Sequence, residues 1–168
     1  KLVIENISSK IRDIFFFHYF NNSINFDIYI IKRKIMSKNF QQISIQQGFM
    51  KHNGGVLFRN ISETEYEFKS TINKNHLNAA GITHGGYLSA LVDAGAGTAA
   101  HRSAENAPCV TISLDLKFIG PSKIGDEIIG NVKILKKTKS LVFLFCELKC
   151  EDKIITSATG VWKILKKS

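Results

Sequence analysis

The stretch NAAGITHGGYLSALVDAGAGTAAH, residues 78–101, constrains the fold more than any other part of the chain. From Gly85 onward it predicts a helix, yet most of its residues are Ala, Gly or Ser, and its main large aliphatic residues are Leu88, Leu91 and Val92. Glycine inside a helix costs about 0.5–1 kcal/mol relative to alanine, so this composition needs a compensating reason. We predict that a sheet wraps closely around the helix and leaves little room for side chains.

One carboxylate, Asp93, lies in the middle of this helix, and the turn His84-Gly85-Gly86 lies directly before it. An acid in an apolar helix needs a partner, an exposed position or a function, because burying an unpaired carboxylate is expensive. The first turn of a helix has backbone N–H groups without intrahelical partners, and the helix dipole favours negative charge there. The N–H groups of Gly85 and Gly86 could therefore stabilise an oxyanion.

Two polar residues near this turn have alternative interpretations. His84 either contacts a substrate or caps the helix, and Asn78 either orients a water molecule or holds the loop. For Gly95 and Gly97 we favour close packing over a chemical role.

The residues before the central helix predict a short helix and a hairpin. Scattered apolar residues in 37–50 indicate an amphipathic helix that stops at the sequence HNGG, residues 52–55. The β-rich runs 56–61 and 65–72 are separated by three polar residues, which predicts a hairpin.

The residues after the central helix predict four strands. In 110–119 strict alternation places Ile112, Leu114, Leu116 and Phe118 on one face, and Thr111, Ser113, Asp115 and Lys117 on the other. A turn at 120–126 precedes strands near 127–135, 141–150 and 154–165. We predict that the four strands form an antiparallel meander in an α+β domain, with the long helix on the apolar face of the sheet.

The three cysteines, Cys109, Cys146 and Cys150, form neither a CxxC pair nor an even disulfide set. Alternation places Cys146 and Cys150 among aliphatic residues, where a free cysteine behaves as a small hydrophobe. No His or Cys lies at metal-ligand spacing, so we expect no metal site. Unpaired cysteines indicate a reducing compartment, the cytoplasm.

Residues 1–35 differ in composition from the rest of the chain. They contain no Ala, Gly or Pro, and 24 of the 35 are Ile, Phe, Asn, Lys or Tyr, as translation of AT-rich non-coding DNA would give. We expect Met36 to be the true start, 1–35 to be a non-native or disordered extension, and 36–168 to be the domain. The apolar run 14–20 is much shorter than the roughly 20 residues that a membrane span needs. His18 also breaks the continuous apolar core that a signal peptide needs. An amphipathic surface anchor is the remaining alternative.

The formal net charge of the chain is +9. Residues 1–35 contain six Lys or Arg and three Asp or Glu, which leaves +6 on the remainder. Such a charge suits a polyanionic partner, either a phosphorylated small molecule or nucleic acid. The sequence has no basic groove interleaved with aromatic residues, so we favour the small molecule and expect no nucleic acid partner.

A specific pattern emerges from the order Asn78, Gly81, His84-Gly85-Gly86, Leu91, Asp93 and Ala94. It resembles the hotdog-fold acyl-CoA thioesterases, and within them the PaaI-like group, whose motif is N-x-x-G-x-x-H-G-G, four residues, then L-x-D-x-A. The resemblance spans about residues 40–165 and includes SLDLKFIGPSKIGD, residues 113–126. One departure is Gly95, where the family often has alanine.

The resemblance implies a role for individual residues in the hydrolysis of acyl-CoA thioesters. Asp93 would be the general base or nucleophile, and Gly85 would supply the oxyanion N–H. His84 and Asn78 would position the thioester carbonyl and the attacking water. Ser113 would assist the acid.

The resemblance also implies an assembly and a substrate site. Asp93 of one subunit would face Asn78 and Gly85 of the other in a homodimer, and two dimers would form a tetramer. Gly86 is a candidate substrate contact, and Lys117 and Lys123 are candidates for the coenzyme A phosphates or, alternatively, solvated surface lysines. A thioester is reactive enough for one carboxylate and one N–H to suffice, so no cofactor is expected beyond the coenzyme A of the substrate.

Two other functions fit the same architecture, a dehydratase and a non-catalytic acyl-CoA sensor. A dehydratase needs a His and an acid poised for proton abstraction beside a carbonyl, and the HGG spacing matches the thioesterases better. A sensor would normally lack the helix acid or carry a DNA-binding module, which residues 1–35 do not resemble.

Overall fold

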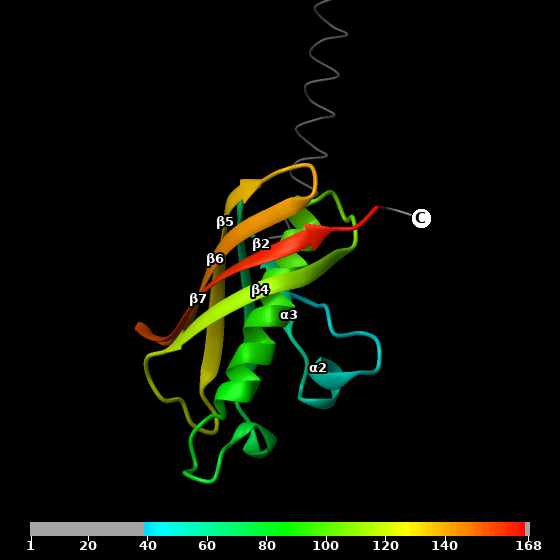
Figure 1. Cartoon of the computed structure of the whole chain (residues 1–168). Coiled ribbons are helices and arrows are strands. Elements are labelled where there is room, and N and C mark those ends of the chain that lie inside the picture. The colour runs from blue at the N-terminus through cyan, green and yellow to red at the C-terminus, as the bar shows by residue number, and fades with distance from the viewer. Residues whose placement is uncertain (1–38, 167–168) are drawn as a thin grey trace, which may run out of the picture. The chain divides into compact units, whose positions relative to one another are not determined.

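Within residues 39–166, which the computed structural model describes, a seven-stranded antiparallel sheet curves around one long helix (Figure 1). The helices are α2 (Phe49–His52), the one-turn η1 (Lys74–His76) and the long α3 (Gly85–Ser103). The strands are β1 (Gln41–Gln42), β2 (Leu57–Asn60), β3 (Glu65–Thr71), β4 (Cys109–Phe118), β5 (Glu127–Lys137), β6 (Leu141–Cys150) and β7 (Lys153–Ile164). The expected α+β class is confirmed. The expected extension, 1–35, lies outside the described residues.

The small residues of α3 allow the close packing that the sequence predicts. A Cβ atom built on Gly95 would overlap the ring of Phe68 in β3, and so would one built on Gly130 in β5. Phe68 is fully buried, so its ring fills the space between the helix and the sheet. Interiors packed this tightly do not accept an added methyl group without movement, and this fixes the helix against the sheet.

The strand order is β1-β2-β3-β5-β6-β7-β4, so the predicted four-strand meander is wrong. β5, β6 and β7 do follow one another, but β4 pairs with β7 at the far edge. Residues 120–126 form a crossing loop that returns the chain to the end of β3, where the Ile72 N–H donates to the Asp126 carbonyl at 2.9 Å. Local alternation predicts that a segment is a strand but not which strand it pairs with, so it could not show that β4 pairs with β7.

The alternation of β4 contains a break that the sequence does not show. The register shifts between Thr111 and Ser113, so that Thr111 lies opposite Trp162 and Ser113 lies opposite Val161. Residues directly opposite one another share a face of the sheet, and Trp162 is buried toward α3. Thr111 therefore faces the helix and Ser113 faces away. The predicted common face for these two residues is wrong, because a bulge reverses which residues face the core.

The predicted helix over 37–50 is also wrong in the described part. Gln41 and Gln42 pair with β2 as a strand, and the helix is a single turn at α2. The predicted stop is confirmed, because Gly54 and Gly55 adopt φ values of +90° and +78° and end that turn. Such positive φ angles favour glycine.

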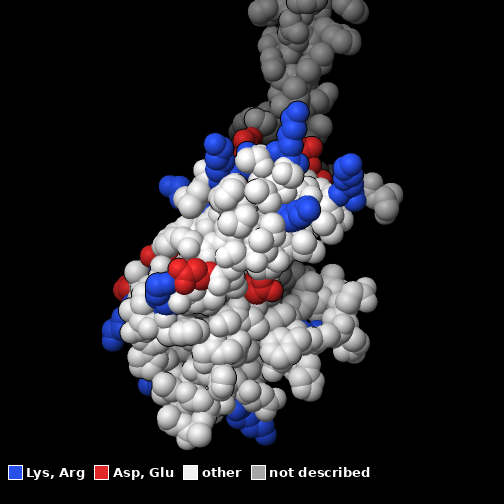
Figure 2. Space-filling view, in the orientation of Figure 1, with Lys and Arg blue, Asp and Glu red and all other residues white. Residues whose placement is uncertain are grey.

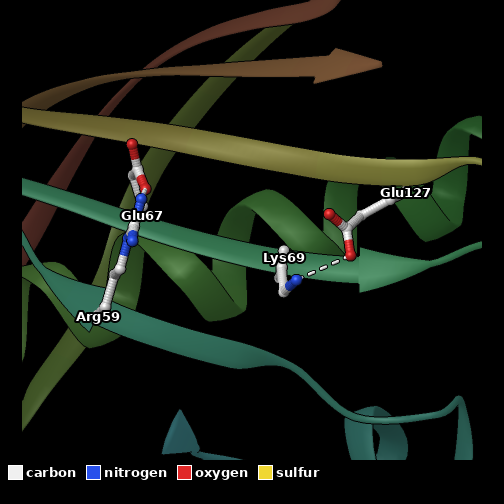
Figure 3. Close-up of polar contacts among 4 residues, drawn as sticks. All are labelled: Arg59, Glu67, Lys69 and Glu127. Atoms are coloured by element: carbon white, nitrogen blue, oxygen red, sulfur yellow. Dashed lines mark hydrogen bonds and ion pairs between the residues drawn. The ribbon is translucent and has the colours of Figure 1, made fainter. Parts of the chain in front are cut away.

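The β2–β3 hairpin is confirmed, and cross-strand ion pairs cover its polar side. Arg59 Nε donates to Glu67 Oε2 at 2.6 Å, and Lys69 Nζ donates to Glu127 Oε2 at 2.8 Å (Figure 3). The Arg59 guanidinium and the Lys69 ammonium also lie 4.5 and 4.9 Å from the centre of the Phe40 ring. These cation–π contacts hold the residues before β1 against the sheet.

All three cysteines are free thiols, as expected. Cys146 is fully buried, and desolvation raises the pKa of its thiol to about 12. It therefore behaves as a small hydrophobe at neutral pH. In the part of the chain that the structure describes, no helix is long and apolar enough to cross a membrane, and no three His, Cys, Asp or Glu side chains gather as a metal site requires.

Candidate active site

The first turn of α3 leaves one backbone N–H available. The Gly86 N–H donates to His84 Nδ1 at 2.8 Å, and the Tyr87 and Leu88 N–H groups donate to the His84 carbonyl at 2.9 and 3.2 Å. Within residues 39–166 the N–H of Gly85 has no hydrogen-bond partner. This donor, at the positive end of the helix dipole, can receive a developing negative charge.

His84 caps the helix, and the cap decides which ring nitrogen can face a ligand. Because the Gly86 N–H donates to Nδ1, the neutral ring carries its hydrogen on Nε2. The side chain is exposed, so Nε2–H is available to an incoming carbonyl. Capping and substrate contact are thus compatible roles. The same bond uses the Gly86 N–H within the turn, so Gly85 is the candidate oxyanion donor of the two glycines, and the expected substrate contact of Gly86 stays a prediction.

Asn78 holds the loop that leads into this turn. Its Oδ1 accepts the N–H of Ala80 at 2.9 Å and that of Ile82 at 3.3 Å. Its backbone N–H donates to the Ile82 carbonyl at 2.9 Å, and Gly81 between them has a φ of +77°. Asn78 therefore fixes a tight turn six residues before His84, one of the two roles expected for it.

A buried pair of hydroxyl groups fastens this loop to the crossing loop at 120–126. The Thr83 N–H donates to the Ser122 carbonyl at 2.8 Å, and Ser122 Oγ donates to Thr83 Oγ1 at 2.7 Å. Both side chains are buried. Sequence analysis missed this pair, since nothing local connects residues 39 positions apart.

His76, which was also missed from the sequence, packs against the first turn of α3. The ring is buried and stacks on Tyr87, with ring centres 3.6 Å apart. Its Nδ1 accepts the Asn73 N–H at 3.1 Å, so its Nε2–H donates to the Asn53 carbonyl at 2.9 Å. Desolvation lowers the pKa of His76, opposed in part by the Asn53 hydrogen bond. The neutral ring, with its hydrogen on Nε2, thus forms both hydrogen bonds.

The backbone of His76 completes this support. Its carbonyl accepts the His84 N–H at 2.7 Å, and the hydroxyl of Tyr87 lies 2.8 Å from Ser70 Oγ in a buried contact. The first turn of α3 is therefore tied to β3 and to the end of α2 by buried hydrogen bonds, which fix its geometry.

Asp93 lies in a different setting, at the exposed surface of α3. Its Oδ1 accepts a hydrogen bond of 2.6 Å from Thr111 Oγ1 on β4. The carboxylate opens onto a groove whose lining residues are Asp93, Ala94, Gly97, Thr98, His101, Pro108, Cys109, Val110, Thr111 and Trp162. A hydrated carboxylate held in place by one hydroxyl can reach a water or an electrophile.

The remaining predicted site residues lie elsewhere in the chain. Ser113 is exposed on the face of β4 opposite Thr111, so the hydroxyl that contacts Asp93 within one chain is that of Thr111. Lys117 pairs with the carboxylate of Asp115 at 2.5 Å, and Lys123 lies in the crossing loop. Neither lysine lines the Asp93 groove.

The two reactive elements do not meet within one chain. Gly85 and Asp93 are eight residues apart on one continuous helix. At a rise of 1.5 Å per residue they are separated by roughly 12 Å along its axis.

Comparisons with known proteins connect this geometry to a family. Residues 80–156 match the family model described as Thioesterase superfamily. A Pseudomonas aeruginosa protein named "Putative esterase PA0474" is 34% identical over 94 residues, which cover 55% of this chain and 70% of that protein. The chain belongs to the thioesterase superfamily. Its general chemistry is therefore the hydrolysis of thioesters.

Two further proteins are similar to this chain in sequence or in fold. Human acyl-coenzyme A thioesterase 13 is 25% identical over 128 residues, which cover 75% of this chain and 85% of that protein. A mutant of the phenylacetic acid degradation protein PaaI from Thermus thermophilus shares the fold, with a TM-score of 0.62 and 23% identity over 70% of this chain and 98% of that one. The hotdog fold and the PaaI-like resemblance are confirmed.

Proposed function

We propose that this chain hydrolyses acyl-CoA thioesters to a free acid and coenzyme A. The observation that carries the proposal is the exposed Asp93 carboxylate, hydrogen-bonded by Thr111 at the edge of an open groove. Relatives named as acyl-coenzyme A thioesterases support the choice of coenzyme A as the thiol.

The proposed mechanism needs few groups because a thiolate is a good leaving group. Asp93 acts as the general base that takes a proton from the attacking water and passes it to the departing sulfur, or as the nucleophile itself, in which case water hydrolyses the resulting anhydride to release the acid. The Gly85 N–H and the His84 Nε2–H donate to the carbonyl oxygen as it becomes negative. Protonation of the departing sulfur completes the release of coenzyme A. No cofactor enters this scheme.

The distance along α3 supports a site shared between two chains. Asp93 and the Gly85 N–H must act on the same carbonyl, but roughly 12 Å of helix separates them in one chain. β4 is the last strand of the sheet, and its Val110 and Ile112 are 45% and 58% exposed. An edge strand with exposed apolar residues favours pairing with another chain.

We therefore propose a homodimer in which Asp93 and Thr111 of one subunit face Asn78, His84 and Gly85 of the other, with dimers pairing into tetramers. The proposed location is the cytoplasm, as the unpaired cysteines suggest.

The test is thiol release from a panel of acyl-CoAs of different chain length and aromatic content, using wild type and Asp93→Asn. We expect hydrolysis by wild type and a loss of roughly 10²–10⁴-fold in kcat for the variant, the range of general acid–base catalysis. Asp115→Asn, an exposed acid on β4, is the matched control. Full activity of Asp93→Asn would eliminate the proposed role of this residue, and saturable binding without turnover would favour a sensor.

A further inference from the structure

The groove beside Asp93 continues toward the C-terminal end of α3. Asp93, Gly97 and His101 succeed one another at intervals of four residues, so they follow one face of the helix, and Pro108 lines the groove beyond them. The His101 ring is held there, because its Nδ1 lies 2.8 Å from the Ala107 carbonyl. A ligand whose reacting atom is at Asp93 can therefore extend along α3 to its end.

The β5–β6 hairpin and the end of β7 lie at this end of the groove. The Leu165 N–H donates to the Pro108 carbonyl at 2.8 Å, and the Ile164 N–H donates to the Ser140 carbonyl at 2.8 Å. Lys137 Nζ donates to the Ser103 carbonyl, in the last turn of α3, at 2.9 Å. These bonds place the hairpin beside the groove.

Positive charge gathers here in a group that we call the basic end. Its members are exposed lysines of β5, the hairpin turn and the end of β7, namely Lys136, Lys137, Lys139, Lys163 and Lys166. Figure 2 shows several Lys and Arg side chains, with fewer Asp and Glu, around the end of the molecule where this hairpin lies. Among residues 39–166 only Lys137 of this group forms an ion pair, with Glu105 at 3.8 Å.

The opposite end of the same strands has a different charge pattern. There Asp126, Glu127, Glu151 and Asp152 accompany Lys149 and Lys153, so the signs are mixed. At the basic end Glu105 pairs with Lys137, and among residues 39–166 the other four lysines of the group form no ion pair, so net positive charge remains there to attract an anionic ligand.

The span from Asp93 to the basic end suits one kind of polyanion. Asp93 and Ser103 are ten residues apart on α3, which corresponds to roughly 15 Å of helix. In coenzyme A an extended pantetheine arm separates the sulfur from a diphosphate and a further phosphate. We propose that the basic end binds the phosphates of the coenzyme A part of the substrate, an inference that rests on the proposed function. Lys117 and Lys123, the candidates from sequence, lie outside this path.

The test compares Lys136→Gln/Lys139→Gln with wild type, using an acyl-CoA and the corresponding acyl-pantetheine, which lacks the phosphates. We expect KM for the acyl-CoA to rise about tenfold with kcat unchanged, and KM for the acyl-pantetheine to stay as in wild type. The control Lys149→Gln/Lys153→Gln removes the same charge at the opposite end. An unchanged KM for the acyl-CoA, or an equal rise for both substrates, would overturn the proposal.

A binding measurement separates this proposal from the proposed function. Calorimetric titration with coenzyme A and with pantetheine needs no turnover. If wild type hydrolyses no thioester but binds coenzyme A more tightly than the Lys136→Gln/Lys139→Gln variant does, the basic end is supported and the hydrolase is not. If coenzyme A and pantetheine bind equally to wild type, the basic end is rejected even where hydrolysis is observed.

Discussion

The N-terminal turn of α3 and the groove around Asp93 are built in opposite ways. At the turn, His76, Tyr87 and the Thr83–Ser122 pair are buried, and hydrogen bonds use every amide of the first turn except that of Gly85. Around Asp93 the surface is open, and Thr111 holds the carboxylate with one bond. The comparison indicates that buried hydrogen bonds fix the proposed donors in place, whereas the Asp93 carboxylate is exposed in the single chain and is held by one bond.

Removing the single available amide at the turn has the largest expected effect among the changes considered below. Gly85 is the first helical residue, and His84 before it has φ −64° and ψ 132°, a conformation compatible with a following proline. Gly85→Pro should keep the helix and remove the N–H, so we expect kcat to fall roughly 10²–10³-fold. Steady-state kinetics and thermal unfolding measure the two effects.

Gly85→Ala is the control, since it adds a Cβ but keeps the N–H. That Cβ would lie 3.3 Å from the exposed ring of Phe118, which can move aside. If the Gly85→Pro and Gly85→Ala variants have equal activity, the Gly85 amide does not take part in catalysis. Mixing Gly85→Pro with Asp93→Asn tests the shared site, because random mixed dimers would regain about a quarter of wild-type activity.

Next in size is the loss of the hydroxyl that holds Asp93. Thr111→Val keeps the shape of the side chain and removes the 2.6 Å bond to the carboxylate. We expect kcat to fall about tenfold, since hydrogen bonds to charged groups contribute roughly 1.5–3 kcal/mol. Ser113→Ala is the comparison, and a larger effect there than at Thr111 would contradict the register of β4.

A smaller effect is expected for the second proposed donor of the turn. His84→Asn keeps a side chain that caps helices well but removes the Nε2–H donor. We expect unchanged thermal stability and a fall of several-fold in kcat/KM, less than for the backbone amide. If His84 serves only as a cap, the asparagine variant will have wild-type kinetics, whereas His84→Ala will lose about 1 kcal/mol of stability.

The pH dependence of stability has the smallest expected effect. Burial holds the pKa of His76 below its ordinary value of 6.5 in the folded state. Below pH 6.5 the unfolded chain therefore binds a proton that the folded chain does not, so stability decreases as pH falls, by at most about 1.4 kcal/mol per pH unit. Above pH 6.5 this contribution is constant.

Urea unfolding at pH 7.5, 6.5 and 5.5 measures that dependence. His76→Gln should make the slope between pH 6.5 and 5.5 shallower, because the amide does not titrate, and His52→Gln at the exposed end of α2 is the matched control. An identical slope in wild type and His76→Gln would show that His76 does not couple folding to pH.

The sequence was most informative where local composition has a direct structural meaning. Backbone geometry explains three features that the sequence predicts and the structure contains. They are the close packing of the small residues of α3, the stop at Gly54-Gly55 and the turn before Gly85. The hotdog fold followed from the motif. The strand order was not predictable, because the paired residues of β4 and β7 lie 38 to 55 positions apart in the chain.

The local positions of the candidate site residues could be predicted in part. Gly85 and Asp93 belong to one helix and His84 is its N-cap, so their places in the chain need no tertiary information, and their roles stay predictions. Thr111 was missed because one bulged residue in β4 reverses which side chains face α3, and the amino-acid types there give no sign of it. His76 was missed because its burial depends on Tyr87 and Asn53, which are distant in the sequence.

Phe68, whose ring is enclosed between Gly95 and Gly130, has a consequence for how related sequences can vary. An alanine at position 95 would collide with this ring, so it requires a smaller residue at position 68. The three positions should therefore change together among homologues. Gly95→Ala alone should displace α3 and with it Asp93, two residues away, whereas Gly95→Ala with Phe68→Leu should restore both stability and the position of the carboxylate.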